Sequence, residues 1–300
     1  MRIFVTGATG FVGSAIVSDL VAAGHQVVGL ARSEEAVHAL AVAGAEAHRG
    51  DLNDTASLRA GAAAVDAVIH AAFDHDFARL VESCEMDRLS IEAIGDALAG
   101  SNKRFIVTSG LPQVFGRVAT ENDLPPSDGH GMPRRSEQAA RALLERGVKA
   151  MVVRMSQVHD RTKQGFATYL LAHARERNVS SYVGDGANRW PAVHRLDAAR
   201  LYGLMLEHGV AGRSYHAVAE QGVPVRAIAE AIGDRLKVPV TALPEADAAG
   251  HFGWLDRIAQ MDIPASSLFT QEALGWRPVQ PQNILDDIKQ SLAIGMGDRR

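Results

Sequence analysis

The sequence predicts an α/β protein, in which a doubly wound parallel sheet carries a smaller, helix-rich C-terminal lobe. Three observations support this prediction. The chain opens on a short apolar strand, residues 3–5, that runs directly into a glycine-rich turn, residues 6–13. A helix-patterned stretch, Phe11–Ala23, and a second apolar strand, Gln26–Leu30, complete a βαβ unit. Short apolar runs then alternate with helical patterns, which is typical of a parallel sheet covered by helices.

The glycine-rich turn is the strongest functional signal in the chain. It follows a strand and opens a helix, where the free N–H groups of the first turn and the positive end of the helix dipole favour a phosphate. Glycine lets the backbone approach such a ligand closely. We therefore predict a pyrophosphate cradle that consists of Gly7, Thr9, Gly10, Phe11, Val12 and Gly13.

The spacing of the three glycines carries a family resemblance. The stretch T-G-A-T-G-F-V-G, with glycines at 7, 10 and 13, resembles the extended and atypical short-chain dehydrogenase/reductases, which include sugar-nucleotide epimerases and 3β-hydroxysteroid dehydrogenases. The resemblance implies a Rossmann nucleotide domain and an NAD(P)-dependent oxidoreductase that acts on a small carbonyl or hydroxyl compound. A-L-G-W-R-P at 273–278 resembles the usual close of the family, so the resemblance spans nearly the whole chain.

Composition limits the partners and the compartment. A hydrophobic fraction of 47%, a charged fraction of 22% and a net charge of −4 describe an ordinary soluble protein without the basic excess of a nucleic-acid binder. The single cysteine, Cys84, allows no intrachain disulfide, which suits a cytoplasmic location. We find no signal peptide and no apolar run that could cross a membrane. We expect a small-molecule substrate as partner, with a homodimer left open.

The residues after the second strand predict the choice of cofactor. Arg32 stands where an NAD-preferring fold places an acid for the ribose hydroxyls. A guanidinium can bind a 2′-phosphate through paired hydrogen bonds, and Ser33 can add another, so we predict NADP(H) rather than NAD(H). The alternative is that Arg32 is solvated and that Glu34 or Glu35 serves the ribose. These two acids fit better in the first turn of the next helix, where the helix dipole favours negative charge.

The next elements lead toward the adenine. A helix over Glu34–Ala43 and a strand over Ala45–His48 precede Asp51 and Leu52. The resemblance places the adenine contact at Asp51-Leu52. The alternative is that Asp51 caps the short helix that follows.

A fourth strand, Val65–Ala72, is apolar enough to be buried on both faces. Its last residues, His70, Ala71 and Ala72, resemble the family's stretch that passes under the cofactor. The stretch from 70 to 76 also holds two histidines and two aspartates, but without a helical His pair, and a capped loop is the simpler interpretation. We predict no metal site.

A long helix over Asp76–Ala99 and a fifth strand over Arg104–Thr108 follow. We assign Thr108 to the cofactor site. The resemblance implies a catalytic hydroxyl at the end of this strand; Ser109 is the nearest one, although Gly110 is the other residue that the register could place there.

The Tyr-x-x-x-Lys pair of the family is absent. Pro133 and Glu137 stand at its two places, and none of the four tyrosines is followed four residues later by a lysine. In the family, the lysine lowers the tyrosine pKa so that the phenol can exchange a proton with the substrate. Another group must serve here, and the candidate catalytic residues are Ser109, His130, Glu137 and His194.

Glu137 has two interpretations. Arg134, Glu137 and Arg141 share one face of the predicted helix at spacings of three and four residues. In a structural role, Glu137 bridges the two arginines. In a functional role, Glu137 or Arg134 lies at the nicotinamide end of the cofactor.

The second half of the chain predicts the substrate lobe. A sixth strand, Val148–Arg154, leads into residues that resemble the family's turn over the nicotinamide, and a helix over Phe166–Arg177 follows. Arg189 and Trp190 are candidate substrate contacts, and the alternative for Trp190 is the core of the lobe. We expect residues 1–155 and 191–220 to form the nucleotide domain, and residues 156–190 and 221–300 the lobe.

These expectations favour an NADP(H)-dependent oxidoreductase with a non-standard active site. A module that binds NADP(H) and reports its redox state without turnover is the alternative from another class, because function depends on the site rather than the fold. An epimerase or isomerase is a third.

Overall fold

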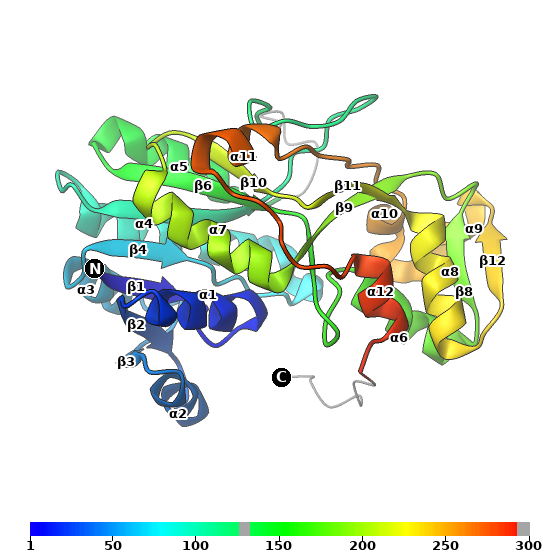
Figure 1. The fold of residues 1–300 in the computed structure, drawn as a ribbon, viewed down its shortest axis with the longest axis horizontal. Coiled ribbons are helices and arrows are strands. Elements are labelled where there is room, and N and C mark those ends of the chain that lie inside the picture. The colour runs from blue at the N-terminus through cyan, green and yellow to red at the C-terminus, as the bar shows by residue number, and fades with distance from the viewer. Residues whose placement is uncertain (126–132, 293–300) are drawn as a thin grey trace.

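The computed structural model describes residues 1–125 and 133–292. Seven parallel strands form the main sheet in the order β10-β6-β5-β4-β1-β2-β3 (Figure 1). The strands are β1 (Arg2–Thr6), β2 (Gln26–Ala31), β3 (Glu46–Arg49), β4 (Ala67–His70), β5 (Arg104–Gly110), β6 (Lys149–Met155) and β10 (Ser214–Ala217). This confirms the predicted doubly wound parallel sheet.

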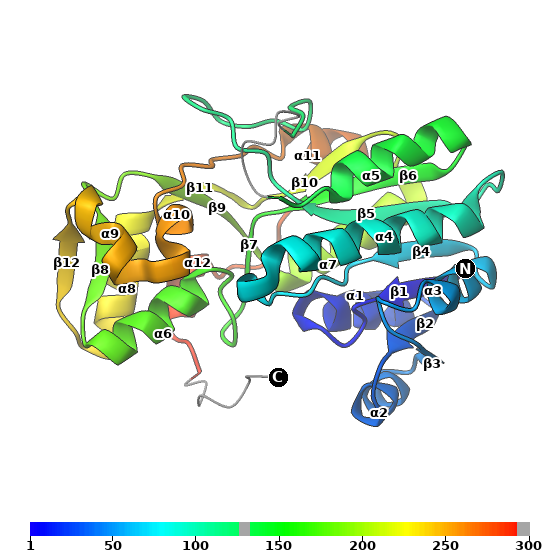
Figure 2. The same cartoon turned by 180° about the vertical axis from the view of Figure 1, so that it is seen from behind.

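Helices cover both faces of this sheet. Figure 1 shows α1 and α7 in front of it, and Figure 2 shows α4 and α5 on the opposite face. The helices around the sheet are α1 (Phe11–Ala22), α2 (Glu34–Val42), α3 (Thr55–Ala63), α4 (Leu80–Leu98), α5 (Ser136–Ala142) and α7 (Arg195–His208), with short 3₁₀ turns η1 (Phe77–Arg79) and η2 (Leu143–Arg146). We call the sheet and these helices the nucleotide domain.

The central strands are buried on both faces, as expected for a parallel sheet. In β5, Ile106 packs into the core on the α1 and α7 side, whereas Phe105 and Val107 pack into the core on the α4 side. Strand alternation therefore gives each layer of helices its own hydrophobic core. The same alternation places successive side chains at the carboxyl end of each strand on opposite faces of the sheet.

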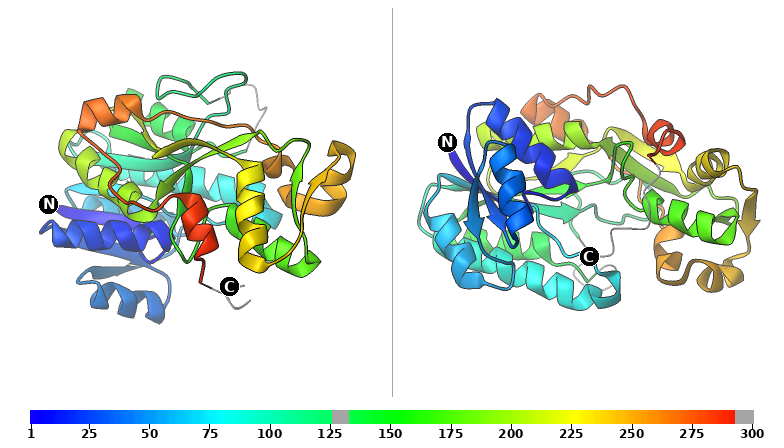
Figure 3. Two further views of the ribbon diagram at one scale, coloured as in Figure 1. Left: turned by 45° about the vertical axis from the view of Figure 1, so that its right-hand side comes forward. Right: turned by 90° about the horizontal axis from the view of Figure 1, so that it is seen from below.

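A smaller lobe lies beyond the carboxyl ends of the strands (Figures 1 and 3). It contains a three-stranded sheet, β11-β9-β7, and a two-stranded sheet, β12-β8, and it has its own apolar core. Its elements are β7 (Gln157–His159), α6 (Ala167–Arg177), β8 (Ser180–Val183), β9 (Arg189–His194), β11 (Glu220–Pro224), α8 (Val225–Leu236), β12 (Val240–Leu243), α9 (Glu245–Phe252), η3 (Gly253–Leu255), α10 (Asp256–Ala259) and α12 (Ile284–Lys289). Ligands of such folds bind outside the carboxyl ends of the strands, on the side where this lobe lies, and we call this region the cleft.

One late segment departs from the predicted domain boundary. Helix α11 (Leu268–Leu274) contacts α7 and β10, and Trp276 is fully buried in the core of the nucleotide domain. The Trp276 indole N–H donates to the carbonyl of Asp197, and the Asp197 carboxylate accepts from the backbone N–H of Val279 at 3.0 Å. Residues 221–300 are therefore not all lobe, because this segment returns to the main sheet, and Asp197 anchors the returning chain.

Two predicted elements start later in the structure. The long helix expected from Asp76 begins with the 3₁₀ turn η1 and becomes α-helical only at Leu80. The helix expected to start near Pro133 begins at Ser136, so Arg134 lies before it rather than on its face. No described helix is long and apolar enough to cross a membrane.

Candidate functional site

The glycine-rich turn and the loop after β4 lie side by side, at the point where the strand order of the sheet reverses. Gly7 has a positive φ of 69°, and a Cβ atom there would lie 2.8 Å from the backbone of Ala72. The backbone of Ala71 and Ala72 thus borders the predicted pyrophosphate cradle. No residue other than glycine fits at position 7 without moving this loop.

Gly10 and Gly13 serve different purposes. A Cβ at Gly13 would lie 1.9 Å from the carbonyl oxygen of Gly7, so Gly13 is needed for close packing of α1 against the turn. Gly10 is the N-cap of α1, has an ordinary extended conformation, and is exposed together with Thr9. No side chain caps α1, which leaves the first amides of the helix, including those of Phe11 and Val12, to a ligand. This geometry fits the pyrophosphate of a dinucleotide.

Arg32 is exposed directly after the core of β2, and its guanidinium has no acidic partner within residues 1–125 and 133–292. The two neighbouring acids are engaged elsewhere. Glu34 accepts a hydrogen bond of 2.7 Å from Arg49, whereas hydrogen bonds from its own N–H and from Ser33 lower the pKa of Glu35. Ser33 is also the N-cap of α2. The sequence did not indicate that Arg49 pairs with Glu34, because only the pairing of β2 with β3 brings Arg49 next to this acid.

The predicted adenine contacts have local partners. Asp51 accepts two hydrogen bonds of 2.9 Å from Asn53, and Asp54, not Asp51, caps α3. The capping alternative for Asp51 is therefore wrong, since Asp54 fills that position. Leu52 packs at the edge of the α4-side core, and its carbonyl accepts from Ser90.

His70 belongs to a buried polar network rather than to the surface of the cleft. Its side chain is fully buried, with Nδ1 hydrogen-bonded to the Thr6 hydroxyl at 2.8 Å and Nε2 to the Asp87 carboxylate at 3.3 Å. The Asp87 carboxylate also accepts a hydrogen bond of 2.5 Å from Ser136. Burial raises the pKa of Asp87, but the charge of Arg134 and these hydrogen bonds outweigh it and hold the pKa below its usual value.

This network positions Arg134 at the edge of the cleft. Its Nε donates to the Ser136 hydroxyl at 2.7 Å, and its Nη2 donates to the carbonyl of Thr108 at 2.9 Å. The guanidinium lies over the ring of Phe73, 4.1 Å from the ring centre. Its Nη1 has no partner among the described residues. The guanidinium is thus a cation held beside the end of β5, with one N–H group left to donate to a ligand.

Glu137 is a structural ion-pair partner. Its side chain is fully buried, and it accepts hydrogen bonds from Arg154, from Arg141 at 2.9 Å and from Ser214 at 3.0 Å. Burial raises the pKa of Glu137, but the hydrogen bonds and charges of Arg154 and Arg141 lower it further than burial raises it. Glu137 thus bridges two arginines, as the structural interpretation stated, with Arg154 in place of Arg134. A carboxyl held ionised in this way is unsuited to donate a proton.

The other predicted residues at the end of β5 are separated by strand alternation. The Thr108 hydroxyl is hydrogen-bonded at 2.8 Å to the Tyr202 hydroxyl on the α7 side, whereas Ser109 is buried on the opposite side of the strand. Burial raises the pKa of the Tyr202 phenol, which makes it a poor acid. His130 lies outside the described residues.

The candidate substrate contacts Arg189 and Trp190 are already occupied. Arg189 donates to both carboxylate oxygens of Asp262, at 3.0 and 2.9 Å. Trp190 is 1% exposed and belongs to the core of the lobe. The alternative interpretation of Trp190 therefore describes the structure, whereas Arg189 is paired with Asp262 and stays partly exposed.

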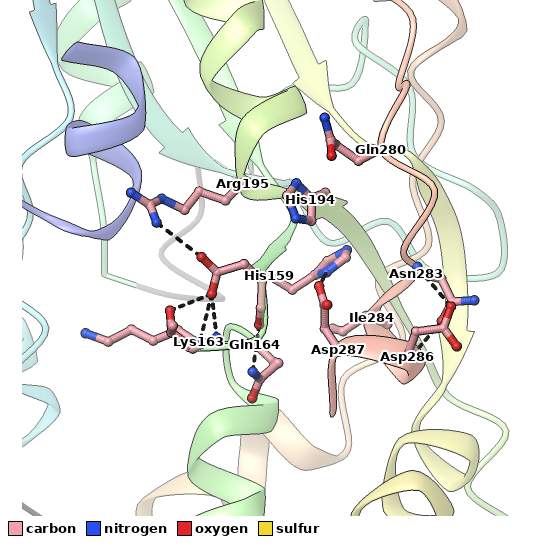
Figure 4. Close-up of polar contacts among 12 residues, drawn as sticks. His159, Lys163, Gln164, His194, Arg195, Gln280, Asn283, Ile284, Asp286 and Asp287 are labelled. Carbon is pink, nitrogen blue, oxygen red and sulfur yellow. Dashed lines mark hydrogen bonds and ion pairs between the residues drawn. The ribbon is translucent and has the colours of Figure 1, made fainter. Parts of the chain in front are cut away.

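A second polar cluster lies around His159 and His194, where the chain passes between the nucleotide domain and the lobe (Figure 4). We call this region the hinge. His159 is buried and bonded to Asp287 at 2.7 Å, and its ring meets the ring of His194 edge-on at 5.6 Å. His194 caps α7 by accepting from the N–H of Leu196, and burial and His159 lower its pKa. In Figure 4 the side chain of Arg195 points toward α1, whereas His194 lies on the α12 side. His194 is thus not grouped with the other catalytic candidates.

Fold and site together define a nucleotide-binding protein of the Rossmann type, with a glycine cradle at the switch point of a parallel sheet. Residues 3–219 match the model of the NAD dependent epimerase/dehydratase family. The chain belongs to this family, which confirms the resemblance.

Three relatives cover most of the chain. An uncharacterized protein of Saccharomyces cerevisiae is 42% identical over 98% of this chain and 100% of its own length. An uncharacterized protein of Schizosaccharomyces pombe is 43% identical over 95% and 98%. A 4-hydroxy-2-methyl-3-oxo-4-farnesyl-3,4-dihydroquinoline-1-oxide ketoreductase of Stigmatella aurantiaca is 27% identical over 89% and 85%.

Two solved structures show the same fold at low sequence identity. A dTDP-glucose 4,6-dehydratase from Streptomyces venezuelae, with NAD bound, has a TM-score of 0.75 at 21% identity over 97% of this chain and 95% of its own. A UDP-glucose 4-epimerase from Thermotoga maritima has a TM-score of 0.74 at 19% identity over 97% of both chains.

Proposed function

We propose that this chain is an NADP(H)-dependent oxidoreductase that reduces a carbonyl compound. The observation that carries the choice of NADP(H) is the unpaired guanidinium of Arg32 at the end of β2, beside two acids that have other partners. An acid free to bind ribose hydroxyls would favour NAD(H), whereas a free guanidinium favours a 2′-phosphate. Bound NADPH would supply the hydride. Gly7, Gly10 and Gly13 would let the backbone hold the pyrophosphate.

Arg134 takes the place of the missing tyrosine in this proposal. It follows Pro133, which stands at the tyrosine position, and the Asp87–Ser136 network fixes its guanidinium. An arginine does not release its proton in proteins, so its role would be to stabilise the oxygen as negative charge develops. Preorganised donors of this kind contribute strongly because they need not reorient during the reaction.

His75 is a titratable side chain close to Arg134: its ring meets edge-on, at 5.2 Å, the Phe73 ring that the Arg134 guanidinium covers. Desolvation lowers the pKa of His75, and the charge of Arg134 adds to the effect. A neutral imidazole beside water can relay a proton to the alkoxide. In this role His75 replaces the four candidates drawn from the sequence.

The Stigmatella relative supports carbonyl reduction, since its name describes a ketoreductase. Arg134 and His75 support the same reaction, because a guanidinium can stabilise the developing negative charge on a carbonyl oxygen and an imidazole can relay a proton to it.

The test offers NADPH and a panel of aldehydes, ketones and quinones to the purified protein. Consumption of NADPH with formation of the matching alcohol or quinol supports the proposal. Tight binding of NADPH without consumption over the whole panel would favour the redox-reporting module. Interconversion of a sugar nucleotide with no net change in NADPH would favour an epimerase.

A further inference from the structure

A row of aromatic rings leads away from Arg134 toward the lobe. The Arg134 guanidinium covers Phe73, the Phe73 ring meets His75 edge-on at 5.2 Å, and the His75 ring meets Phe77 at 6.1 Å. Phe77 in turn stacks on Trp254 of η3, with ring centres 4.5 Å apart and planes inclined by 14°. The row crosses from the loop after β4 into the lobe. It begins at the cation that we assign to the carbonyl oxygen.

The far end of the row is exposed. Trp254 exposes 48% of its surface and Tyr169 exposes 37%, although both are large aromatic side chains. Tyr169 of α6 lies edge-on against both Phe77 and Trp254. An open pocket of about 360 Å³ begins at Tyr169 and Trp254 and continues between α6 and α9, where its lining holds both apolar side chains and the polar His173, Glu176, Arg177 and His251. Exposed aromatic rings beside a pocket of this size are typical of a binding site for a ligand with an aromatic part.

We propose that this row binds a flat aromatic ketone or quinone that carries an apolar extension. The carbonyl oxygen lies at Arg134, the aromatic ring of the substrate lies along Phe73 and Phe77, and the extension reaches the pocket beside Trp254. This inference rests on the proposed carbonyl reduction and names its substrate class. Ring faces that are stacked or edge-on recognise other rings more strongly than they recognise saturated chains of equal size.

The stack of Phe77 on Trp254 forms a clamp at the middle of the row. Both residues lie on short 3₁₀ turns rather than in long helices, η1 and η3. Gly253 precedes Trp254 with a φ of 56°, and no atom lies within 4 Å of where its Cβ would be. The two stacked rings therefore come from different parts of the fold, Phe77 from the segment after β4 and Trp254 from the lobe.

The charge along the row fits an electron-rich oxygen rather than a cation. Arg134 and Lys163 place positive charge at His75, and Asp74 places negative charge there. The two acids of the same loop, Asp74 and Asp76, both lie near Arg79, with the closest nitrogen and oxygen atoms 3.8 and 3.6 Å apart. A carbonyl or quinone oxygen is thus favoured at the Arg134 end over an ammonium group, which the guanidinium repels.

The test compares two ketones with the same number of carbons, 9-fluorenone and dicyclohexyl ketone, by calorimetry on the NADP⁺-bound protein. No reduction occurs with the oxidised cofactor, so binding is measured apart from turnover. We expect fluorenone to bind at least about tenfold more tightly, and Trp254→Leu to abolish this preference. Equal affinities for the two ketones, or binding of neither, would overturn the inference.

Two further variants separate the role of the Trp254 ring in binding from any effect on the stability of the protein. Trp254→Phe keeps an aromatic face and should keep the fluorenone preference within about threefold. Phe269→Leu breaks an unrelated stack, that of Phe269 on Tyr215 at 5.9 Å, and should leave both affinities unchanged. A preference that survives in Trp254→Leu would show that the row does not bind the ketone.

These measurements distinguish the two proposals. If fluorenone binds as expected but NADPH is never consumed, the substrate site stands and the reduction fails. If small aliphatic carbonyls are reduced and fluorenone does not bind, the reduction stands and the aromatic site fails.

Discussion

The Glu137 carboxylate and the Arg154 guanidinium are joined by two hydrogen bonds of 2.7 Å, and neither side chain exposes any surface. Arg154 also donates to the backbone carbonyl of Asp123 at 2.6 Å and contacts His216 at 3.0 Å. The pair thus ties α5, β6 and the loop after β5 together beneath the cleft. Breaking a buried pair leaves an uncompensated charge, which costs more than the pair contributes when it is intact.

We expect Glu137→Gln to lower the free energy of unfolding by about 3–5 kcal/mol at neutral pH, because Arg154 stays buried without a counter-charge. Urea titration measures this. Glu92→Gln is the matched control, since Glu92 pairs with Arg88 on the exposed face of α4 and should cost less than about 1 kcal/mol. Equal losses in the two variants would contradict the prediction.

The same pair predicts a dependence of stability on pH. The folded protein holds the pKa of Glu137 below its ordinary value of 4.5. The stabilisation is therefore complete above this value and is lost as pH falls through the lowered pKa. Below pH 4.5, the free energy of unfolding should fall more steeply in the parent than in Glu137→Gln. Parallel curves in urea titrations across this range would show that another group controls acid unfolding.

Arg32→Ala should weaken NADPH binding by about 1.5–3 kcal/mol, the usual contribution of a hydrogen bond to a charged group, and should leave NADH binding nearly unchanged. Calorimetry with both cofactors provides the measurement. Arg59→Ala is the control, because it removes an exposed arginine of α3 that pairs with Asp96 of α4. Equal affinity of the parent protein for NADPH and NADH would refute the assignment.

Gly10→Val and Gly13→Val should fail in different ways. A side chain at Gly10 meets only the Gly7 carbonyl oxygen, at 3.1 Å, so this variant should fold but lose binding of both cofactors because the valine fills the phosphate position. At Gly13 the clash with backbone should lower the melting temperature as well. Thermal unfolding and calorimetry together separate the two. Retained NADPH binding in folded Gly10→Val would place the phosphate elsewhere.

Turnover should not depend on any tyrosine hydroxyl. Phenylalanine at each tyrosine should keep kcat within a few-fold, including Tyr202, whose raised pKa makes it a poor acid. In contrast, Arg134→Gln should lower kcat by about 10²–10³, as removal of an oxyanion donor does, with little change in NADPH affinity. Steady-state kinetics of the variants tests both statements. One Tyr→Phe variant that binds NADPH but is inactive would restore a tyrosine mechanism.

The nucleotide half of the site could be predicted from the sequence because its signals are local. A strand, a glycine turn and a helix are adjacent in the chain, and Arg32 follows the next strand directly. The network around Arg134 is not local: Thr6, Asp87 and Ser136 come from three elements that only the fold brings together. One signal was present, because Asp87 stands between Cys84 and Ile91 on the apolar face of α4.

The partners of Glu137 show a second limit to what the sequence alone can predict. Helical spacing correctly identifies Arg141, but it also suggests Arg134, which precedes the first turn of α5. The stronger partner, Arg154, lies on β6, and no periodicity connects a helix with a strand 17 residues away. The aromatic row could not be predicted either, since Phe77 and Trp254 are far apart in the chain and meet only when the lobe packs on the cleft.

The Arg195 side chain connects the start of α1 with the segment that leads into the lobe. Its guanidinium donates to Ser14 at the start of α1 at 2.8 Å and to Asp160 of the hinge at 3.1 Å, and it lies over the ring of Phe11. We expect a dinucleotide bound at the start of α1 to be coupled, through these contacts of Arg195, to the segment that leads into α6. Thermodynamic reciprocity then requires the ketone to tighten the dinucleotide by the same factor by which the dinucleotide tightens the ketone.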